Sequence, residues 1–390
     1  MASGGVGDLG RVVAALTAPG APFGVVRGES GGLVYASGPR TLVEFVETTW
    51  AFGDRPFLLI GERSFSYGEF FAASSALAVR LVGGEFGLRP GDRVCIAMSD
   101  RIEWQVAFWG VQLAGLVAVP VDPSWGEEAV ASVLDDCTPR LLFVDRARLS
   151  RVEGWAHAAA APVVLLEGEP EGADPALAPP GLDVRPEDCS TIFYMGGGSS
   201  GRRPLGAVAT HLAQAGAVMN ARFFAAVSDL GRGGRGPGRG PIPGFGAVPV
   251  TNLTYPFFHP ASFADVYRAM ALGGSLRVGE GERGAGRGGS TVAETSGAVL
   301  FDGLPTPVTE VRVTGPRGEA LPDGEVGELW LRGQSLARGY WGDPEAGRAA
   351  FPERGGGWFL TGVRATVRDG CVSRYEGGGG GEGGGGDGGA

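Results

Sequence analysis

Between residues 41 and 170 the hydrophobic positions follow two alternating spacings. Short, uninterrupted apolar runs are typical of strands buried on both faces, and apolar residues that recur every three or four positions are typical of helices. The predicted strands are Val94–Met98, Val117–Val121, Leu141–Val144 and Val163–Leu166. Three helices are predicted. The first begins at the capping box Ser66–Glu69 and continues through Leu81, and the other two are Arg101–Leu116 and Glu127–Asp136. Strands alternating with helices favour an α/β fold with a parallel sheet covered on both faces.

A second stretch, 187–280, follows the polar, proline-rich linker Gly168–Pro186 and repeats this alternation. Thr191–Met195 is predicted to be a strand that runs into a glycine-rich loop. The other predicted elements are the helices Leu212–Val227 and Phe263–Leu272 and the strands Leu253–Phe258 and Ser275–Val278. We therefore expect two α/β subdomains, 41–170 and 187–280, after an N-terminal extension, 1–40.

The C-terminal third has the pattern of antiparallel strands. Val308–Val313 and Glu328–Arg332 are predicted strands, and Asp369-Gly370 favours a hairpin turn. We expect a smaller β-rich subdomain over 290–376, followed by a disordered glycine-rich tail, 377–390.

Composition narrows the possible chemistry. The 390 residues include 43 acidic and 33 basic ones, for a net charge of −10, which argues against a nucleic-acid partner. Every basic residue other than the three histidines is arginine, so a Walker A phosphate loop and Schiff-base catalysis are excluded. The four cysteines form no CxxC pair and offer little for a zinc site. No apolar run is long enough for a transmembrane helix, and Met1–Ala15 lacks the apolar core of a signal peptide, so we expect a cytoplasmic protein.

The strongest candidate for ligand chemistry is the segment Tyr194–Gly206, which follows a predicted strand. Its glycines allow successive backbone amides to point at one anion, and Ser199 and Ser200 add hydroxyl donors. The segment fits a phosphate-binding loop, or equally a local excess of the glycine that makes up 72 residues of the chain. Its glycines also fit the dinucleotide-binding pattern G-x-G-x-x-G, although Pro204 and Gly206 would delay the helix that this pattern requires.

Other segments carry weaker signals. Tyr255–His259, an aromatic pair ending in histidine, fits either the wall of an apolar acyl pocket or a core strand with a capping histidine. Glu294 and Thr295 place a carboxylate beside a hydroxyl, which suits Mg²⁺ and a phosphate oxygen but is also an ordinary solvated pair. Gly327–Gly333, Gly339–Glu345 and Gly357–Gly362 are predicted strands and turns.

Taken in order, these segments resemble the adenylate-forming (AMP-binding) superfamily, specifically its long-chain fatty-acid–CoA ligases. The segments that carry the resemblance are Gly91–Met98, Glu103–Trp109, Thr191–Tyr194, Pro256–His259 and the stretch from Glu294 to about Val372. The resemblance implies the N-terminal domain of the adenylate-forming fold. It also implies a reaction that joins a fatty acid or other small carboxylic acid to ATP, releases pyrophosphate and transfers the acyl group to the thiol of coenzyme A.

The resemblance assigns roles to individual residues. Ser199, Ser200, Gly201 and Gly206, with Thr295, would bind the ATP phosphates. Glu294 would hold Mg²⁺, and Phe258 and His259 would lie at the pocket for the acyl group and the adenylate.

The sequence also departs from the family pattern. The phosphate loop of the family ends in Pro-Lys-Gly, whereas this loop ends in Pro204-Leu205-Gly206. Val363 stands where the family has the acid that binds the ribose hydroxyls. The stretch between Gly274 and Glu294 is short, and the family's C-terminal lid with its catalytic lysine would follow Val372, where this sequence continues into glycine. Two hypotheses follow: an ATP-dependent fatty-acid–CoA ligase, or a catalytically inactive, truncated relative that acts as a binding module or is a fragment of a longer gene product.

Overall fold

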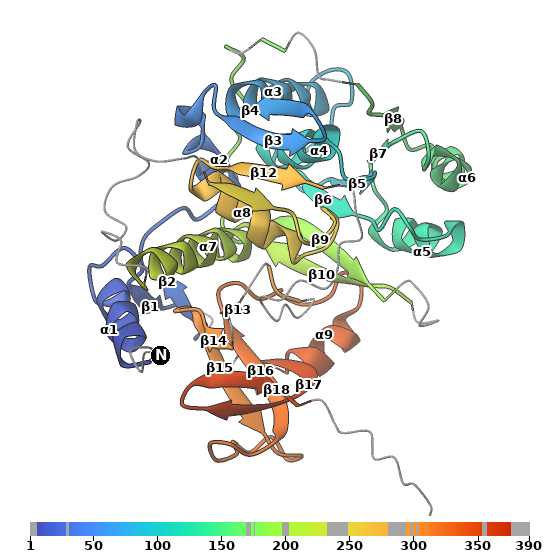
Figure 1. Cartoon of the computed structure of the whole chain (residues 1–390). Coiled ribbons are helices and arrows are strands. Elements are labelled where there is room, and N and C mark those ends of the chain that lie inside the picture. Colours follow the sequence, from blue (N-terminus) through green and yellow to red (C-terminus); the bar gives the residue numbers. More distant parts are fainter. Residues whose placement is uncertain are drawn as a thin grey trace, which may run out of the picture.

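Helices and strands recur along the described part of the chain in the computed structural model (Figure 1). The described residues are 6–28, 31–168, 173–174, 176–196, 203–231, 249–279, 294–296, 299–301, 303–352 and 357–375. The predicted disordered tail, 377–390, lies outside these residues.

The largest sheet has six strands in the order β10-β9-β6-β5-β7-β8. Its strands are β5 (Arg93–Ala97), β6 (Val117–Pro120), β7 (Leu141–Val144), β8 (Val163–Leu165), β9 (Cys189–Met195) and β10 (Leu205–Thr210). The strands from β9 to β8 run parallel, and β10 pairs antiparallel with β9. The predicted parallel sheet is confirmed.

A second, four-stranded sheet has the order β11-β12-β3-β4. It combines β3 (Pro56–Ile60) and β4 (Arg63–Ser66) with β11 (Val250–Asn252) and β12 (Ser275–Val278). Strand β12 runs parallel to β3, although more than 200 residues separate them, and β9 and β10 belong to the first sheet. The boundary expected between 41–170 and 187–280 therefore does not separate the two sheets.

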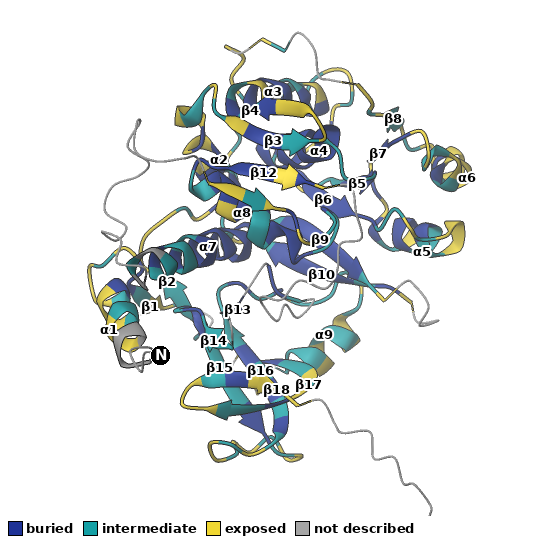
Figure 2. Ribbon diagram, in the orientation of Figure 1, coloured by how far each residue is buried: buried dark blue, intermediate teal, exposed yellow. Residues whose placement is uncertain are grey.

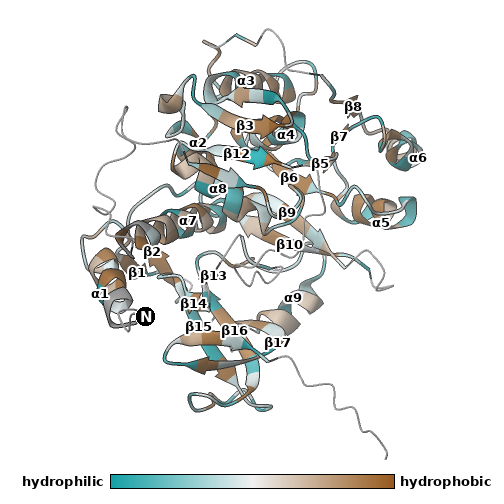
Figure 3. Ribbon diagram, viewed as in Figure 1, coloured by the Kyte–Doolittle hydropathy of each residue, from teal (hydrophilic) through white to brown (hydrophobic). Residues whose placement is uncertain are grey.

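Helices cover both faces of the six-stranded sheet. On one face lie α4 (Ile102–Leu113) and α7 (His211–Gly231), and on the other lie α5 (Glu127–Cys137) and α6 (Leu149–Ala159). Helices α3 (Tyr67–Val82) and α8 (Ser262–Ala271) pack against α4 and α7, respectively, and contact strands of the four-stranded sheet. The alternating side chains of β5 show the two layers: Val94 and Ile96 pack in the core with α3, α4 and α8, whereas Cys95 and Ala97 pack in the core under α5 and α6. Every residue of α4 is buried. Figure 2 shows that buried residues are concentrated in the strands and helices at the centre of this α/β part of the molecule. In Figure 3, by contrast, α5 and α6 carry a hydrophilic face.

Local sequence determines several helix ends. The predicted capping box is present: Ser66 accepts a hydrogen bond from the Glu69 amide, and the Glu69 carboxylate accepts one from the Ser66 amide. Helix α9 (Pro344–Ala350) begins after Asp343, whose carboxylate accepts from the Ala346 amide, and has proline at its first position.

The C-terminal third forms the predicted β-rich subdomain, at the lower end of the molecule in Figure 1. It is an antiparallel sheet of β15 (Thr309–Thr314), β16 (Gly327–Gly333), β17 (Phe359–Arg368) and β18 (Cys371–Arg374). Asp369 and Gly370 turn between β17 and β18 with positive φ angles, 50° and 76°, as the predicted hairpin requires. A short pair, β13 (Leu300–Phe301) and β14 (Leu304–Pro305), lies beside it.

The N-terminal residues add helices and a small hairpin to this body. The elements are α1 (Val6–Thr17), β1 (Val25–Arg27), β2 (Leu33–Tyr35), α2 (Leu42–Glu47) and a 3₁₀ turn (Trp50–Phe52). Within the described residues, no helix has the length and apolar character that crossing a bilayer requires.

Two sequence-based expectations are wrong. Leu253–Phe258, predicted to be a strand, is irregular, and the His259 amide donates to the Pro256 carbonyl in a turn. The dinucleotide-binding alternative also fails, because that motif needs a helix after its glycines and the chain instead enters β10, antiparallel to β9.

Candidate functional site

The glycine-rich segment connects the two strands of the β9–β10 hairpin. Of its predicted phosphate-binding residues, Ser199, Ser200 and Gly201 lie outside the described part of the chain. Gly206 lies within β10, opposite Tyr194. A Cβ at Gly206 would lie 2.7 Å from Ile192 Cγ2 and 2.8 Å from Tyr194 Cζ, so this glycine permits close packing of the hairpin.

A segment from the β-rich part of the chain lies along β10. The Trp341 amide donates to the Gly206 carbonyl at 2.7 Å, and the Val208 amide donates to the Gly339 carbonyl at 3.0 Å. Ala207 and Tyr340 are paired across this antiparallel contact. The hairpin therefore gains a neighbouring extended segment that sequence analysis treated as an ordinary turn.

The same segment holds Glu294 and Thr295 on its other side. The Ala337 amide donates to the Glu294 carbonyl at 2.8 Å, and Thr295 is paired with Leu336. Thr295 is 1% exposed. The structure thus links the predicted Mg²⁺ carboxylate to the predicted phosphate hairpin through residues 336–341.

A hydrogen bond between side chains completes this arrangement. The Tyr340 hydroxyl donates to Oε1 of Glu294 at 2.6 Å. Burial is the main cause of a raised pKa at Tyr340, and the Glu294 carboxylate adds to it. The phenol therefore stays protonated at neutral pH and acts as a donor.

The donor set around Glu294 fits Mg²⁺ that arrives with a nucleotide. Among the described residues, no three His, Cys, Asp or Glu side chains are grouped so that they could hold a metal by themselves. Mg²⁺ keeps several waters and is commonly bound through one or two protein carboxylates together with substrate phosphates. The single Glu294 carboxylate, joined to Tyr340 beside the predicted phosphate hairpin, fits that mode of binding.

Asp136, in the last turn of α5, contacts the hairpin at both ends of its connection. Its carboxylate accepts from the Tyr194 hydroxyl at 2.5 Å and from the guanidinium of Arg203. Its backbone carbonyl accepts from Trp341 Nε1 at 3.3 Å. Burial is the main cause of a raised pKa at Tyr194, and Asp136 adds to it, so this phenol too remains a donor.

His259 and Phe258 occupy a turn between β11 and α8. The imidazole of His259 stacks on Tyr255 with ring centroids 4.8 Å apart, and its Nδ1 accepts from the Ala261 amide at 3.1 Å. Burial lowers the pKa of His259, and the Asp122 carboxylate, at the end of β6, opposes that shift. Phe258 meets the same imidazole edge to face at 6.4 Å. Neither residue is joined to Glu294 by a hydrogen bond or ring contact within the described residues.

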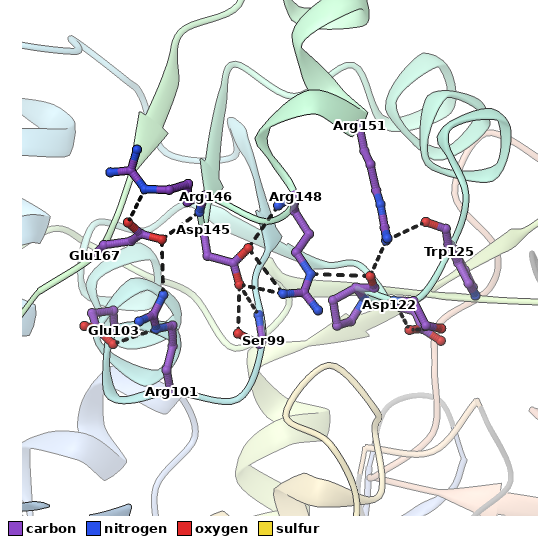
Figure 4. A network of polar contacts seen from close by, with 12 residues as sticks. Ser99, Arg101, Glu103, Asp122, Trp125, Asp145, Arg146, Arg148, Arg151 and Glu167 are labelled. Carbon is purple, nitrogen blue, oxygen red and sulfur yellow. Dashed lines mark hydrogen bonds and ion pairs between the residues drawn. The ribbon is translucent and has the colours of Figure 1, made fainter.

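A polar cleft of about 570 Å³ lies at the carboxyl ends of β5, β7 and β8 (Figure 4). The β5 connection leaves toward α4 and the β7 connection toward α6, on opposite faces, so the cleft lies at a switch point of the sheet. Asp145 accepts from the Ser99 amide and hydroxyl at 2.9 and 2.8 Å and is paired with Arg148 at 3.1 Å. Arg101 joins Glu103 and Glu167, at 3.3 and 3.6 Å. These charges compensate one another and form a structural network.

Val363 lies in the middle of β17, and its side chain is half-buried. Its amide donates to Thr361 Oγ1 at 3.0 Å, and the neighbouring Gly362 amide donates to Glu328 Oε1 at 3.1 Å. An aliphatic side chain at this position offers no acceptor for a sugar hydroxyl.

Sequence reasoning missed Tyr340, Trp341 and Asp136 as parts of this site. The segment Gly339–Glu345 was noticed as a motif, and its aromatic pair was the available signal. Asp136 carries no local signal, because its contacts lie 58 and 67 residues away.

The sequence of the chain is similar to those of known proteins. The family described as AMP-binding enzyme matches residues 45–285 and 290–341. AMB antimetabolite synthetase AmbB of Pseudomonas aeruginosa is 29% identical over 378 residues, which cover 81% of this chain and 29% of that protein. Feruloyl-CoA synthase of Amycolatopsis sp is 27% identical over 359 residues, covering 76% of this chain and 71% of that protein. The chain therefore spans less than a third of AmbB.

Solved structures share the fold. The inhibitor-bound N-terminal domain of FACL13 from Mycobacterium tuberculosis has a TM-score of 0.71 at 18% identity, covering 86% of this chain and 99% of that domain. ATP-bound MatB from Rhodopseudomonas palustris has a TM-score of 0.68 at 19% identity, covering 85% of this chain and 77% of that one. At these identities the likeness shows the fold alone, which is that of the N-terminal domain of adenylate-forming enzymes.

Proposed function

Because the chain belongs to the AMP-binding enzyme family, we propose that it binds ATP with Mg²⁺ and activates a small carboxylic acid as an acyl-adenylate. The observation that carries the proposal is the backbone pairing of residues 336–341 with β10 on one side and with Glu294 and Thr295 on the other. This pairing supports a site in which one carboxylate faces the phosphates held by a glycine-rich hairpin.

In the proposed reaction, a carboxylate oxygen of the acid attacks the α-phosphorus of ATP and forms a new O–P bond. The bond from the α-phosphorus to the bridging oxygen of the β-phosphate breaks, and pyrophosphate leaves. In a second step the thiolate of coenzyme A attacks the acyl carbon, the bond to the adenylate oxygen breaks, and AMP leaves. The thiol proton goes to solvent.

The chain's own residues would bind and orient the reactants. Ser199, Ser200, Gly201 and Thr295 are the proposed donors to the phosphates. Glu294 would hold Mg²⁺, which supplies positive charge to the triphosphate. Phe258 and His259 are the proposed wall of the acyl pocket, and a fatty acid is the proposed substrate class.

Exchange of labelled pyrophosphate into ATP tests this proposal, because it reports adenylate formation without requiring the thiol. We expect exchange that depends on added fatty acid and on Mg²⁺, and its loss in Glu294→Gln. Ferulic acid is tested as an alternative, aromatic substrate, because a relative bears the name feruloyl-CoA synthase. If exchange occurs with ferulic acid and not with a fatty acid, an aromatic acid replaces the fatty acid as the proposed substrate.

A second candidate is a nucleotide-binding protein without turnover. It is favoured by the lysine-free sequence and by Val363 at the position where the resemblance expects a ribose-binding acid. This candidate predicts calorimetric binding of MgATP with no exchange for any acid. The absence of ATP binding at millimolar concentration would contradict both candidates.

A further inference from the structure

Glu294 is held from a distant part of the chain. The Tyr340 hydroxyl, 46 residues later, donates to Oε1 of the carboxylate at 2.6 Å. A glutamate side chain has several rotatable bonds, and a single strong donor to its carboxylate restricts them. The orientation of this carboxylate therefore depends on how firmly Tyr340 is fixed.

The backbone of Tyr340 is fixed against the hairpin. Tyr340 pairs with Ala207 of β10, and the flanking Gly339 and Trp341 hydrogen-bond to Val208 and Gly206 at 3.0 and 2.7 Å. The phenol thus has a defined position relative to β10.

The ring of Tyr340 is supported as well. It meets Phe351 edge to face at 6.2 Å, and Phe351 stacks on Phe359 of β17 at 4.8 Å. These contacts connect the phenol to the β-rich sheet, so the carboxylate orients to the phenol rather than the reverse.

We infer that Tyr340 is a positioning residue that orients the Glu294 carboxylate to receive the Mg²⁺ of MgATP. This inference rests on the proposed function. The phenol uses one carboxylate oxygen, and a carboxylate has about four acceptor sites in total, so the group retains the capacity to bind a cation. Because Tyr340 is paired with Ala207 of β10, the same contact fixes the Glu294 carboxylate relative to β10.

The test compares ATP binding, by calorimetry, in EDTA and in saturating Mg²⁺. In Tyr340→Phe we expect metal-free ATP affinity within about twofold of wild type and a loss of roughly tenfold or more in apparent Mg²⁺ affinity, as when other residues that orient metal ligands are removed. Glu294→Gln should abolish the Mg²⁺ enhancement altogether. The combined variant should be no worse than Glu294→Gln, because Tyr340 acts through Glu294.

Tyr267→Phe is the matched control. It also removes a phenol hydrogen bond, from Tyr267 to Gln214 Oε1 at 2.7 Å, at a fully buried position away from Glu294. A purely structural effect of losing a phenol would lower thermal stability in both variants and leave the Mg²⁺ dependence of ATP binding unchanged.

The outcomes separate this inference from the proposed function. Wild-type protein that binds no ATP, or binds it equally with and without Mg²⁺, contradicts the proposed function, and the inference falls with it. A folded Tyr340→Phe protein with wild-type Mg²⁺ dependence overturns the inference alone. Should Tyr340→Phe not fold, Glu294→Asp withdraws the carboxylate from the phenol, and undiminished Mg²⁺ affinity in that variant would overturn the inference.

Discussion

Asp136 accepts a hydrogen bond from the Tyr194 hydroxyl at 2.5 Å, although 58 residues separate them in the sequence. The same carboxylate pairs with Arg203. Tyr194 is the second-last residue of β9, before the glycine-rich connection, and Arg203 lies just before β10 begins. One side chain of α5 therefore contacts both ends of that connection, in addition to the backbone pairing of Met195 with Leu205.

Replacing Asp136 with asparagine should weaken this contact. The Asp136 side chain is 8% exposed, and the change removes the charge that pairs with Arg203. We expect a loss of about 1–3 kcal/mol in the free energy of unfolding, measured with urea. Asp135→Asn is the control, because Asp135 is exposed and accepts from Trp155 Nε1 at 2.7 Å on the same helix. It should cost less than about 0.5 kcal/mol. Equal losses in the two variants would show that Asp136 has no special role.

Gly206→Ala tests the close packing of the hairpin. The new Cβ would lie 2.7 Å from Ile192 and 2.8 Å from Tyr194, closer than van der Waals contact permits. We expect a loss of about 1–3 kcal/mol in the free energy of unfolding. Gly10→Ala is the control, since a Cβ there has no atom within 4 Å and the residue lies in α1. That change should stabilise the helix by up to about 1 kcal/mol. An unchanged midpoint for Gly206→Ala would mean that the strands separate at little cost.

Buried His211 should make the fold acid-sensitive. The residue is 1% exposed, its Nδ1 accepts from the Leu42 amide at 3.3 Å, and burial lowers its pKa to about 4, against the opposing effect of Asp188. The unfolded chain has a histidine pKa of about 6.5 and therefore binds the proton first as the pH falls. Stability from this group is complete above about pH 6.5 and is lost toward pH 4, by about 3 kcal/mol in total.

Urea unfolding at pH 7 and at pH 4.5 measures this effect. His211→Gln keeps an acceptor for the Leu42 amide but cannot be protonated in this range, so the difference between the two pH values should shrink. His157→Gln removes an exposed histidine of α6 and should leave the difference as in wild type. The prediction fails if His211→Gln and wild type lose the same stability on acidification.

The elements predicted best from the sequence were those with strong local patterns. Leu141–Val144 and Ser275–Val278 match β7 and β12 residue for residue. Strand β7 is apolar and buried throughout, and such a run needs no polar alternation to be recognised. Strand β10 was not predicted from the sequence, because Leu205–Thr210 contains glycine and alanine and follows a glycine-rich segment that is typical of a loop. Leu253–Phe258 was predicted to be a strand, but Pro256 lies in a turn.

Long-range pairing explains what remained hidden in the site. Glu294 was proposed as a site residue because the resemblance and its carboxylate both point to Mg²⁺. Tyr340 and Asp136 acquire their roles only when residues 336–341 lie along β10, and no local periodicity encodes that pairing. For the same reason the partnership of β3 with β12 could not be read from spacing.

Val363→Asp should strengthen nucleotide binding if the resemblance assigns this position correctly. The side chain is half-buried on β17, so a carboxylate there keeps contact with solvent, and the fold should change in stability by no more than about 0.5 kcal/mol. A carboxylate can accept from both ribose hydroxyls, and hydrogen bonds to a charged group contribute about 1.5–3 kcal/mol, so ATP affinity should rise by roughly tenfold or more. Binding of 2′,3′-dideoxy-ATP should not change, because that nucleotide lacks both hydroxyls. Thr366→Asp, on the same strand, controls for the added charge and should not tighten binding of either nucleotide. If Val363→Asp tightens the binding of neither nucleotide, or of both equally, position 363 does not face the ribose. The valine at this position would then not be a cause of weak ATP binding.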